Sequence, residues 1–318
     1  AGERDRWIIQ GHIGSTWQDG QYVRTRELDQ VRPAFEDLLA RLRTDHVELG
    51  MIHYVDSCDE FRAIMDGPFI AYVRELLAAG KIGHIGLSTH NPEVALLACD
   101  EPEIEVIMFS LNPAFDMMPA SEDLEDLFGD YENVSGDGIE PTRARLYARA
   151  EEKDVALTVM KGYAGGRLLS ADASPFGVAL TSVQCIHYAL TRPAVASVMV
   201  GVETVEQLEE ALAYERATAA ERDYASVLAG APKHAYMGQC TYCGHCAPCT
   251  VGINIALSNK FADLAEMAGE VPASVAAHYK AMDVMAGACI ACGDCEPRCP
   301  FDVPIIERME AAEKLFGC

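Results

Sequence analysis

Two short runs of cysteine near the C-terminus have the spacing of iron ligands. In the first run, over 240–249, every third residue is a cysteine. The second run, over 289–299, keeps this spacing for three cysteines and places the fourth one residue later, before Pro300. The second pattern is that of bacterial ferredoxins, in which three thiolates hold one [4Fe–4S] cubane and the fourth reaches the other. The sequence therefore predicts two [4Fe–4S] clusters, through which electrons pass singly.

Each cubane is predicted to take its fourth ligand from the other run. The ligand sets are Cys240, Cys243, Cys246 and Cys299 for one cubane, and Cys289, Cys292, Cys295 and Cys249 for the other. Structural zinc is the alternative, because repeated Cys-x2-Cys pairs also suit tetrahedral sites, but zinc uses close pairs rather than runs of four. Between the runs, 255–268 and 273–285 have helical character, which favours an all-α ferredoxin domain over 233–318.

The composition argues against two classes of partner. The 318 residues carry a formal charge of −24, which would repel nucleic-acid phosphates and an anionic membrane surface. No apolar run approaches the ~20 residues of a transmembrane helix. We therefore expect no nucleic-acid or membrane partner. Cysteines that are grouped for metal rather than for disulfides suggest a reducing cytoplasm.

Upstream of the cysteines, short apolar runs alternate with stretches of helical period, which is the pattern of a parallel α/β fold. The expected strands are 7–11, 47–53, 82–88, 105–110, 155–160 and 196–201, and the expected helices are 27–42, 60–79, 92–99, 141–152, 178–191 and 204–214. No Gly-x-Gly-x-x-Gly follows a strand, as a doubly wound dinucleotide-binding sheet would require. We therefore predict most of a TIM-type (β/α)8 barrel over 1–232, with a boundary at Gly230-Ala231-Pro232.

Most of the residues at the predicted strand ends are polar or ionisable. They are His12, His53, Ser88, Thr89, His90, Asn112, Lys161 and Gly201. In a barrel, active sites form where the strands end at the carboxyl face. The strand ends therefore predict a site at the barrel mouth.

Four segments, taken in order with the cysteine runs, resemble the aldo/keto reductase superfamily in its branch with a C-terminal ferredoxin domain. The segments are MIHY (51–54), GKIGHIGLSTHNPE (80–93), MKGYAGGRLL (160–169) and VGVETVEQLEEAL (200–212). The resemblance covers essentially the whole chain. It implies a barrel that binds a nicotinamide cofactor across its strand ends and passes hydride to or from a carbonyl or alcohol carbon of a small molecule.

The resemblance also implies roles for individual residues. His53 matches the active-site histidine that polarises the substrate oxygen, although a strand-end histidine can also serve only as a hydrogen-bonding residue inside a barrel. Ser88 and Thr89 match the pair that holds the nicotinamide carboxamide, and Asn112 matches the end of the next strand. Two later loops complete the implied cofactor site. The loop at the cofactor's diphosphate contains Lys161, Tyr163, Gly165 and Gly166, and the loop at its adenosine half contains Gly201, Thr204 and Gln207.

This sequence departs from the family pattern in three places. His12 stands where the family has its catalytic lysine. The two strand-helix units that would carry the family's aspartate and tyrosine are absent, so either the sequence is truncated, which we favour, or another chain closes the barrel. Thr204 stands where many relatives have a phosphate-reading arginine, and glutamates surround it, so NADH is favoured over NADPH as the cofactor.

Two main classes of function follow from these observations. The first is an iron–sulfur oxidoreductase that couples NAD(H)- or NADP(H)-linked carbonyl or alcohol chemistry to one-electron transfer, with a ferredoxin or flavoprotein as redox partner. Because hydride carries two electrons and each cubane accepts one, a direct route would need a radical carrier such as a flavin. The second is a non-catalytic electron-transfer or scaffold subunit with a degenerate barrel. Clusters that serve only as structural staples are a third alternative.

His12 and His53 lie on sequential strands, and we expect them to meet at the barrel mouth. With no lysine present, imidazoles near their ordinary pKa of ~6.5 would share a proton between them. Any turnover is then predicted to vary across pH 5–8.

Overall fold

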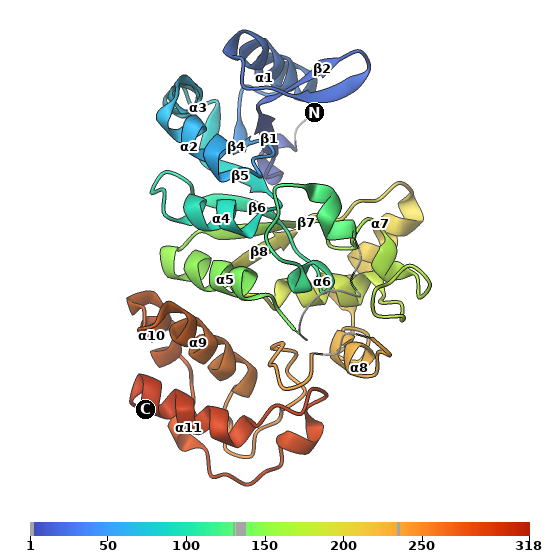
Figure 1. Cartoon of the computed structure of the whole chain (residues 1–318), viewed down its shortest axis with the longest axis vertical. Helices are drawn as coiled ribbons and strands as arrows, with labels where there is room; N and C mark the ends of the chain where they lie inside the picture. The colour runs from blue at the N-terminus through green and yellow to red at the C-terminus, as the bar shows by residue number, and fades with distance from the viewer. Residues whose placement is uncertain (1–2, 130, 132–137, 234–235) are drawn as a thin grey trace. The chain divides into compact units, whose positions relative to one another are not determined.

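A parallel sheet organises the strands that precede the cysteines. The computed structural model describes residues 3–129, 131, 138–233 and 236–318. Within them, a six-stranded sheet has the order β1-β4-β5-β6-β7-β8, and the pairs from β1 to β6 are parallel (Figure 1). Its strands are β1 Gln10–Ile13, β4 Val47–Ile52, β5 Ile82–Thr89, β6 Val106–Ser110, β7 Ala156–Met160 and β8 Val195–Val198. This α/β sheet, with its strands in sequence order, is the architecture expected of a TIM-type barrel.

Helices alternate with these strands, as the sequence pattern predicts. They are α1 Leu28–Leu42, α2 Cys58–Asp66, α3 Pro68–Ala78, α4 Pro92–Cys99, α5 Pro141–Lys153, α6 Ser182–Leu190, α7 Val205–Leu212 and α8 Tyr224–Ala229. Local capping explains several of the helix starts. Asn91 accepts a hydrogen bond from the backbone of Glu93 at the start of α4, and Thr181 and Thr204 each close a capping box, on α6 and α7.

Three local features differ from expectation. The single helix predicted over 60–79 is divided, because a residue that precedes proline is driven out of the helical region, and Gly67 before Pro68 has φ −105° and ψ −176°. A hairpin of β2 Ser15–Gln18 and β3 Gln21–Arg24, which was not predicted, turns at Asp19-Gly20, a common hairpin sequence. Strand β1 begins later than predicted, so His12 lies within the strand rather than after its end.

The chain divides into two compact units that interleave in sequence. The first unit contains the described residues of Ala1–Phe109, Ala120–Leu124 and Val155–Thr158, and the second contains those of Ser110–Pro119, Glu125–Asp154 and Val159–Cys318. In the first unit, α1 contacts β1, while α3 and α4 contact β5, over a core that includes Ile13, Phe35 and Leu87. Neither unit begins or ends near residue 232, because the second unit continues from Val159 to Cys318. The domain boundary expected after residue 232 stays a prediction.

In the second unit, helices pack around α9 Ile255–Ala268. This helix contacts α5, α10 Ala273–Lys280 and α11 Ile305–Phe316, and its buried side chains include Phe261 and Leu264. The helix α9 has the predicted bounds, whereas α10 ends before the predicted residue 285. None of the described helices is both long and apolar enough to cross a membrane.

Candidate functional site

The cysteines of the two runs surround two cavities within the second unit. Cys240, Cys243, Cys246 and Cys299 line one cavity, and Cys249, Cys289, Cys292 and Cys295 line the other. The cavities contain about 310 Å³ and 370 Å³ of space free of protein atoms, and both are partly open to solvent. Each cavity therefore takes three thiols from one run and the fourth from the other, as the spacing predicted.

Several features of the backbone of the first cysteine run repeat in the second. Residues with left-handed backbone occupy equivalent positions: Tyr242 and Gly244 in the first run correspond to Ala291 and Gly293 in the second, and Gly252 and Asp302 each follow the end of their run by three residues. Helices α9 and α11 then begin fifty residues apart. Turns of this kind direct successive backbone N–H groups to one side, where they favour an anion. Two similar loops therefore surround two similar cavities, a repeat that extends beyond the cysteines and was not recognised from the sequence.

The chemistry of the thiols fits iron. None of the cysteines forms a disulfide. Burial raises the pKa of Cys240 to about 12 and that of Cys246 to about 11, and iron coordination favours the thiolate form of such groups. Among the described residues, no group of three or more His, Cys, Asp or Glu side chains is arranged to hold a metal ion, so the fit to iron rests on the four thiols that line each cavity.

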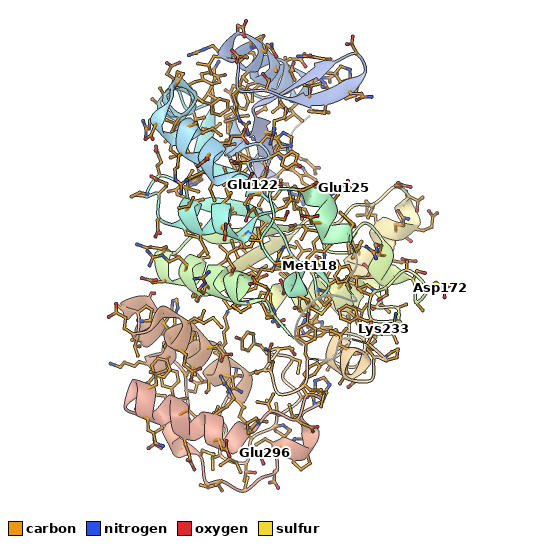
Figure 2. The ribbon with its side chains drawn as sticks, in the orientation of Figure 1. Met118, Glu122, Glu125, Asp172, Lys233 and Glu296 are labelled. Carbon is orange, nitrogen blue, oxygen red and sulfur yellow. The ribbon has the colours of Figure 1, made fainter. Side chains whose placement is uncertain are left out.

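Residues between the last two cysteines fasten the second run to its surroundings. Arg298 donates from Nη2 to the carbonyls of Cys246 (2.7 Å) and Pro248 (2.8 Å), so the second run is tied to the first. Glu296, labelled in Figure 2, accepts a hydrogen bond from the backbone N–H of Ile306 (3.1 Å) in the first turn of α11. The extra residue of the second run thus lies in a segment that connects both cysteine loops.

A buried polar chain connects the turn after β6 with the first cysteine loop, and both ends lie in the second unit. The Asp116 carboxylate accepts hydrogen bonds from the hydroxyls of Tyr147 and Tyr188, the latter at 2.6 Å. The Arg192 guanidinium lies 4.5 Å from the Tyr188 ring centroid, and its Nη2 donates to the carbonyl of Thr241. All five residues are buried. No motif in the sequence marks Asp116 or Arg192, and neither residue was predicted.

In the first unit, the imidazoles of His12 and His53 stack with ring centroids 4.4 Å apart. Burial lowers the pKa of His12, and burial together with the neighbouring His12 and Arg26 lowers the pKa of His53 to about 3. Nδ1 of His53 is buried and has no hydrogen-bond partner in the described chain. The structure therefore brings the two histidines together, but the predicted proton sharing over pH 5–8 is wrong for His53, which stays neutral in that range.

The hydroxyls at the end of β5 are already hydrogen-bonded within the first unit. Ser88 Oγ accepts from the backbone N–H of Tyr54 (2.8 Å), and Thr89 Oγ1 donates to Asp56 Oδ1 (2.9 Å). Nδ1 of His90 lies 2.9 Å from Asp56 Oδ2. Asp56 is a buried organising residue that was not predicted from the sequence, although its place just after the MIHY segment was an available signal.

In the second unit, the predicted positions around the end of β6 and β7 fall close together. Asn112 is fully buried and accepts hydrogen bonds from two backbone N–H groups of the turn that follows it. Its Nδ2 donates to the carbonyl of Lys161 (2.9 Å), so the chain brings these two positions together. The hydroxyls of Tyr163 and Ser182 lie 2.5 Å apart. Asn112 thus organises its own turn.

The two later loops combine open glycines with side chains that cap a helix. Gly165 and Gly166 have φ of +66° and +89°, and the space where a Cβ would stand is open at Gly166 and at Gly201. Thr204 and Gln207 form the capping box of α7, because each side chain accepts from the backbone N–H of the other at 3.3 Å. These loops therefore leave room for a ligand at the glycines, while the two polar side chains serve the helix.

The chain belongs to the aldo/keto reductase family, whose model matches residues 3–229. A second model, the 4Fe-4S dicluster domain, matches residues 209–304 and so includes all eight cysteines of the two runs. The family resemblance predicted from the sequence is confirmed. Membership implies oxidoreductase activity on small carbonyl compounds, and the dicluster match supports [4Fe–4S] clusters in the C-terminal region.

One solved structure agrees with this assignment at the level of fold. The holo form of an aldo-keto reductase from Bacillus halodurans is 19% identical with a TM-score of 0.52, and the match covers 70% of this chain and 72% of that one. A structure from Pseudomonas aeruginosa, also assigned to the aldo-keto reductases, is 23% identical with a TM-score of 0.47 and covers 67% of each chain. No curated protein matches the sequence.

Proposed function

We propose that the chain is an iron–sulfur oxidoreductase that couples nicotinamide-linked carbonyl or alcohol chemistry to one-electron transfer through two [4Fe–4S] clusters. The observation that carries the proposal is the pair of thiol-lined cavities, each built from both cysteine runs. In this proposal, the ligands are Cys240, Cys243, Cys246 and Cys299 for one cluster, and Cys289, Cys292, Cys295 and Cys249 for the other. Each cluster, when bound, accepts or gives one electron at a time.

Metal and sulfide analysis of anaerobically purified protein tests the cluster assignment. We expect about eight irons and about eight sulfides per chain, and a paramagnetic signal of reduced clusters in EPR spectra after dithionite is added. Zinc is silent in this measurement. A preparation that contains zinc and no sulfide would overturn the assignment.

At the barrel, we assign to His53 the role of hydrogen-bonding the substrate oxygen as a neutral imidazole. Its low pKa excludes a charged acid at neutral pH, but a neutral imidazole still polarises a carbonyl by donating one N–H. His12, which replaces the family's lysine, orients the His53 ring by stacking. A nicotinamide, when bound, would supply the hydride; within the second unit, the open backbone at Gly166 and Gly201 leaves room for a ligand.

Calorimetric titration and rate measurements test the barrel site. NADH is expected to bind to the anaerobic protein, and His53→Gln is expected to lower the rate of carbonyl reduction by about 10²-fold. His84→Gln is a suitable control, because His84 is exposed and lies beside Glu105. Equal rates for the two variants would exclude the role proposed for His53.

The second candidate is an electron-transfer or scaffold subunit whose barrel no longer binds a cofactor. It is favoured by the polar residues at the matched cofactor positions, since Ser88, Thr89, Thr204 and Gln207 already bond to their own unit. Full cluster content without nicotinamide binding would establish it. In either case we propose a ferredoxin or flavoprotein as redox partner, and a reducing cytoplasm, in which free thiols persist.

A further inference from the structure

The two cysteine loops repeat in backbone but differ in what covers them. Thr241 and Ile290 occupy equivalent positions, each directly after the first cysteine of its run. Thr241 is 1% exposed, whereas Ile290 is 61% exposed. The loop around the first cavity is therefore covered at Thr241, whereas the loop around the second cavity faces solvent at Ile290.

Two side chains hold the buried loop by one carbonyl. The oxygen of Thr241 accepts from the Tyr224 hydroxyl at 2.6 Å and from Nη2 of Arg192. The other two nitrogens of Arg192, Nε and Nη1, form no hydrogen bond within the described chain. The guanidinium instead lies between two rings, 4.5 Å from the centroid of Tyr188 and 5.1 Å from that of Tyr242.

Arg192 retains its charge in this buried position. Burial by itself lowers the pKa of the guanidinium, but the neighbouring Tyr188, Tyr224 and Asp116 raise that pKa above its ordinary value. Two aromatic faces also stabilise a desolvated cation. A fixed positive charge therefore stands against the backbone of the first cysteine loop, at 1% exposure.

We propose that Arg192 is a positioning residue that raises the reduction potential of the cluster held by Cys240, Cys243, Cys246 and Cys299. The inference rests on the cluster ligands proposed above. Reduction adds one electron, supplied by the redox partner, and therefore one negative charge to a cluster that is already anionic; no proton is required. Burial opposes the added charge, because little solvent responds to it, and a nearby fixed cation offsets this cost. At the other cysteine loop, solvent around the exposed Ile290 would respond to the added charge.

A reductive titration of purified holoprotein followed by EPR tests this role, with the cluster assigned to Cys249, Cys289, Cys292 and Cys295 as an internal reference. Arg192→Met should make the equilibrium constant for reduction of the cluster assigned to Cys240, Cys243, Cys246 and Cys299 about tenfold less favourable, which is about 59 mV for one electron, and should leave the other cluster unchanged. Arg192→Lys keeps the charge and should restore most of the potential. Tyr224→Phe removes only a hydrogen bond and should shift the potential much less.

Arg143→Met is the matched control for the loss of a buried arginine. Arg143 is also fully buried, but it donates to the carbonyls of Met118 and Ser110. We expect this variant to keep both potentials. Full iron content with unchanged potentials in Arg192→Met would overturn the inference, as would equal shifts in Arg192→Met and Tyr224→Phe. Lack of iron in the unmutated protein would instead refute the cluster assignment itself. If Arg192→Met does not fold, an Arg192→Lys potential far below that of the unmutated protein overturns the role of the charge.

Discussion

The two units bury ionisable groups in opposite ways. In the first unit, His12 and His53 stack on each other, and Nδ1 of His53 has no hydrogen-bond partner in the described chain. In the second unit, Asp116 accepts two hydroxyl hydrogen bonds, and Arg192 lies between aromatic rings and donates to a carbonyl. Burial lowers the pKa of both histidines, whereas Arg192 keeps its charge.

The difference shows that burial alone does not decide whether a group is ionised. Desolvation disfavours the charged form in both places, and only partners that interact with the charge can reverse that preference. For His53 the neighbouring charges, including that of Arg26, are also positive and act in the same direction as burial. Buried charge in the second unit is consequently available to influence a cluster, while the histidine pair can act only through hydrogen bonds.

The largest expected effect concerns the eight cysteines of the two runs, which lie in the second unit. Cys249→Ser should mainly remove the cluster assigned to Cys289, Cys292 and Cys295, although those residues lie forty residues or more further along the chain. We expect about four irons to remain of about eight, with the EPR signal of the other cluster intact. Cys299→Ser is the reciprocal variant. Loss of the cluster nearer in sequence, in either variant, would contradict the exchange of fourth ligands.

The next effect tests how much Asp116 contributes to the free energy of unfolding through the buried polar network that it forms with Tyr147 and Tyr188. Asp116→Ala removes the acceptor of the Tyr147 and Tyr188 hydroxyls. It also removes the carboxylate that interacts with the charges of the buried Arg143 and Arg192. Breaking a buried charged network of this kind costs about 3–5 kcal/mol in the free energy of unfolding. Urea denaturation followed by circular dichroism measures the loss. Asp172→Asn is the control, because Asp172 is exposed and should change stability by no more than about 0.5 kcal/mol.

A smaller effect tests the neutral histidine pair. The pKa of His53 is about 3 in the folded chain and ~6.5 when unfolded, so the unfolded state binds more protons between these values. His53 therefore leaves stability unchanged above pH 6.5 and decreases it as pH falls toward 3. Allowing for partial exposure, we expect a loss of about 1–2 kcal/mol between pH 6 and pH 4.

His53→Gln should remove that part of the acid sensitivity, and denaturant unfolding at several pH values measures it. His84→Gln, which alters an exposed imidazole of the same unit, should not reduce the loss. Identical pH profiles for His53→Gln and the unmutated protein would mean that His53 is not held neutral by the fold.

The sequence was informative where chemistry depends on local spacing. Four thiolates within ten residues specify a cluster loop almost independently of the remainder of the chain, and the structure places the eight cysteines around two cavities accordingly. The strand order was predictable for a similar reason, since short apolar runs that alternate with helical period have few arrangements other than a parallel sheet.

Contacts between residues distant in sequence were not predictable in this way. Arg192 and Thr241 are far apart along the chain, and nothing in either local pattern indicates that they bond. The same holds for Asp56 and His90, which meet because β4 and β5 pair in parallel. The pKa of His53 could not be predicted either, because it depends on the burial that the tertiary structure creates.

The smallest expected effect concerns the start of α7, where the family resemblance places the adenosine half of the nicotinamide cofactor. Thr204 caps α7, and Glu206 lies in the first turn, so the start of this helix carries negative charge that disfavours a 2′-phosphate. We predict that NADH binds more tightly than NADPH. Thr204→Arg should strengthen NADPH binding by about tenfold, because one charge-assisted hydrogen bond contributes about 1.5 kcal/mol. The lost cap should cost about 1 kcal/mol of stability.

Thr181→Arg removes the equivalent capping box of α6 and should cost the same stability without improving NADPH binding. Isothermal calorimetry with both nucleotides measures the change, and an unmutated protein that binds NADPH as tightly as NADH would contradict the prediction.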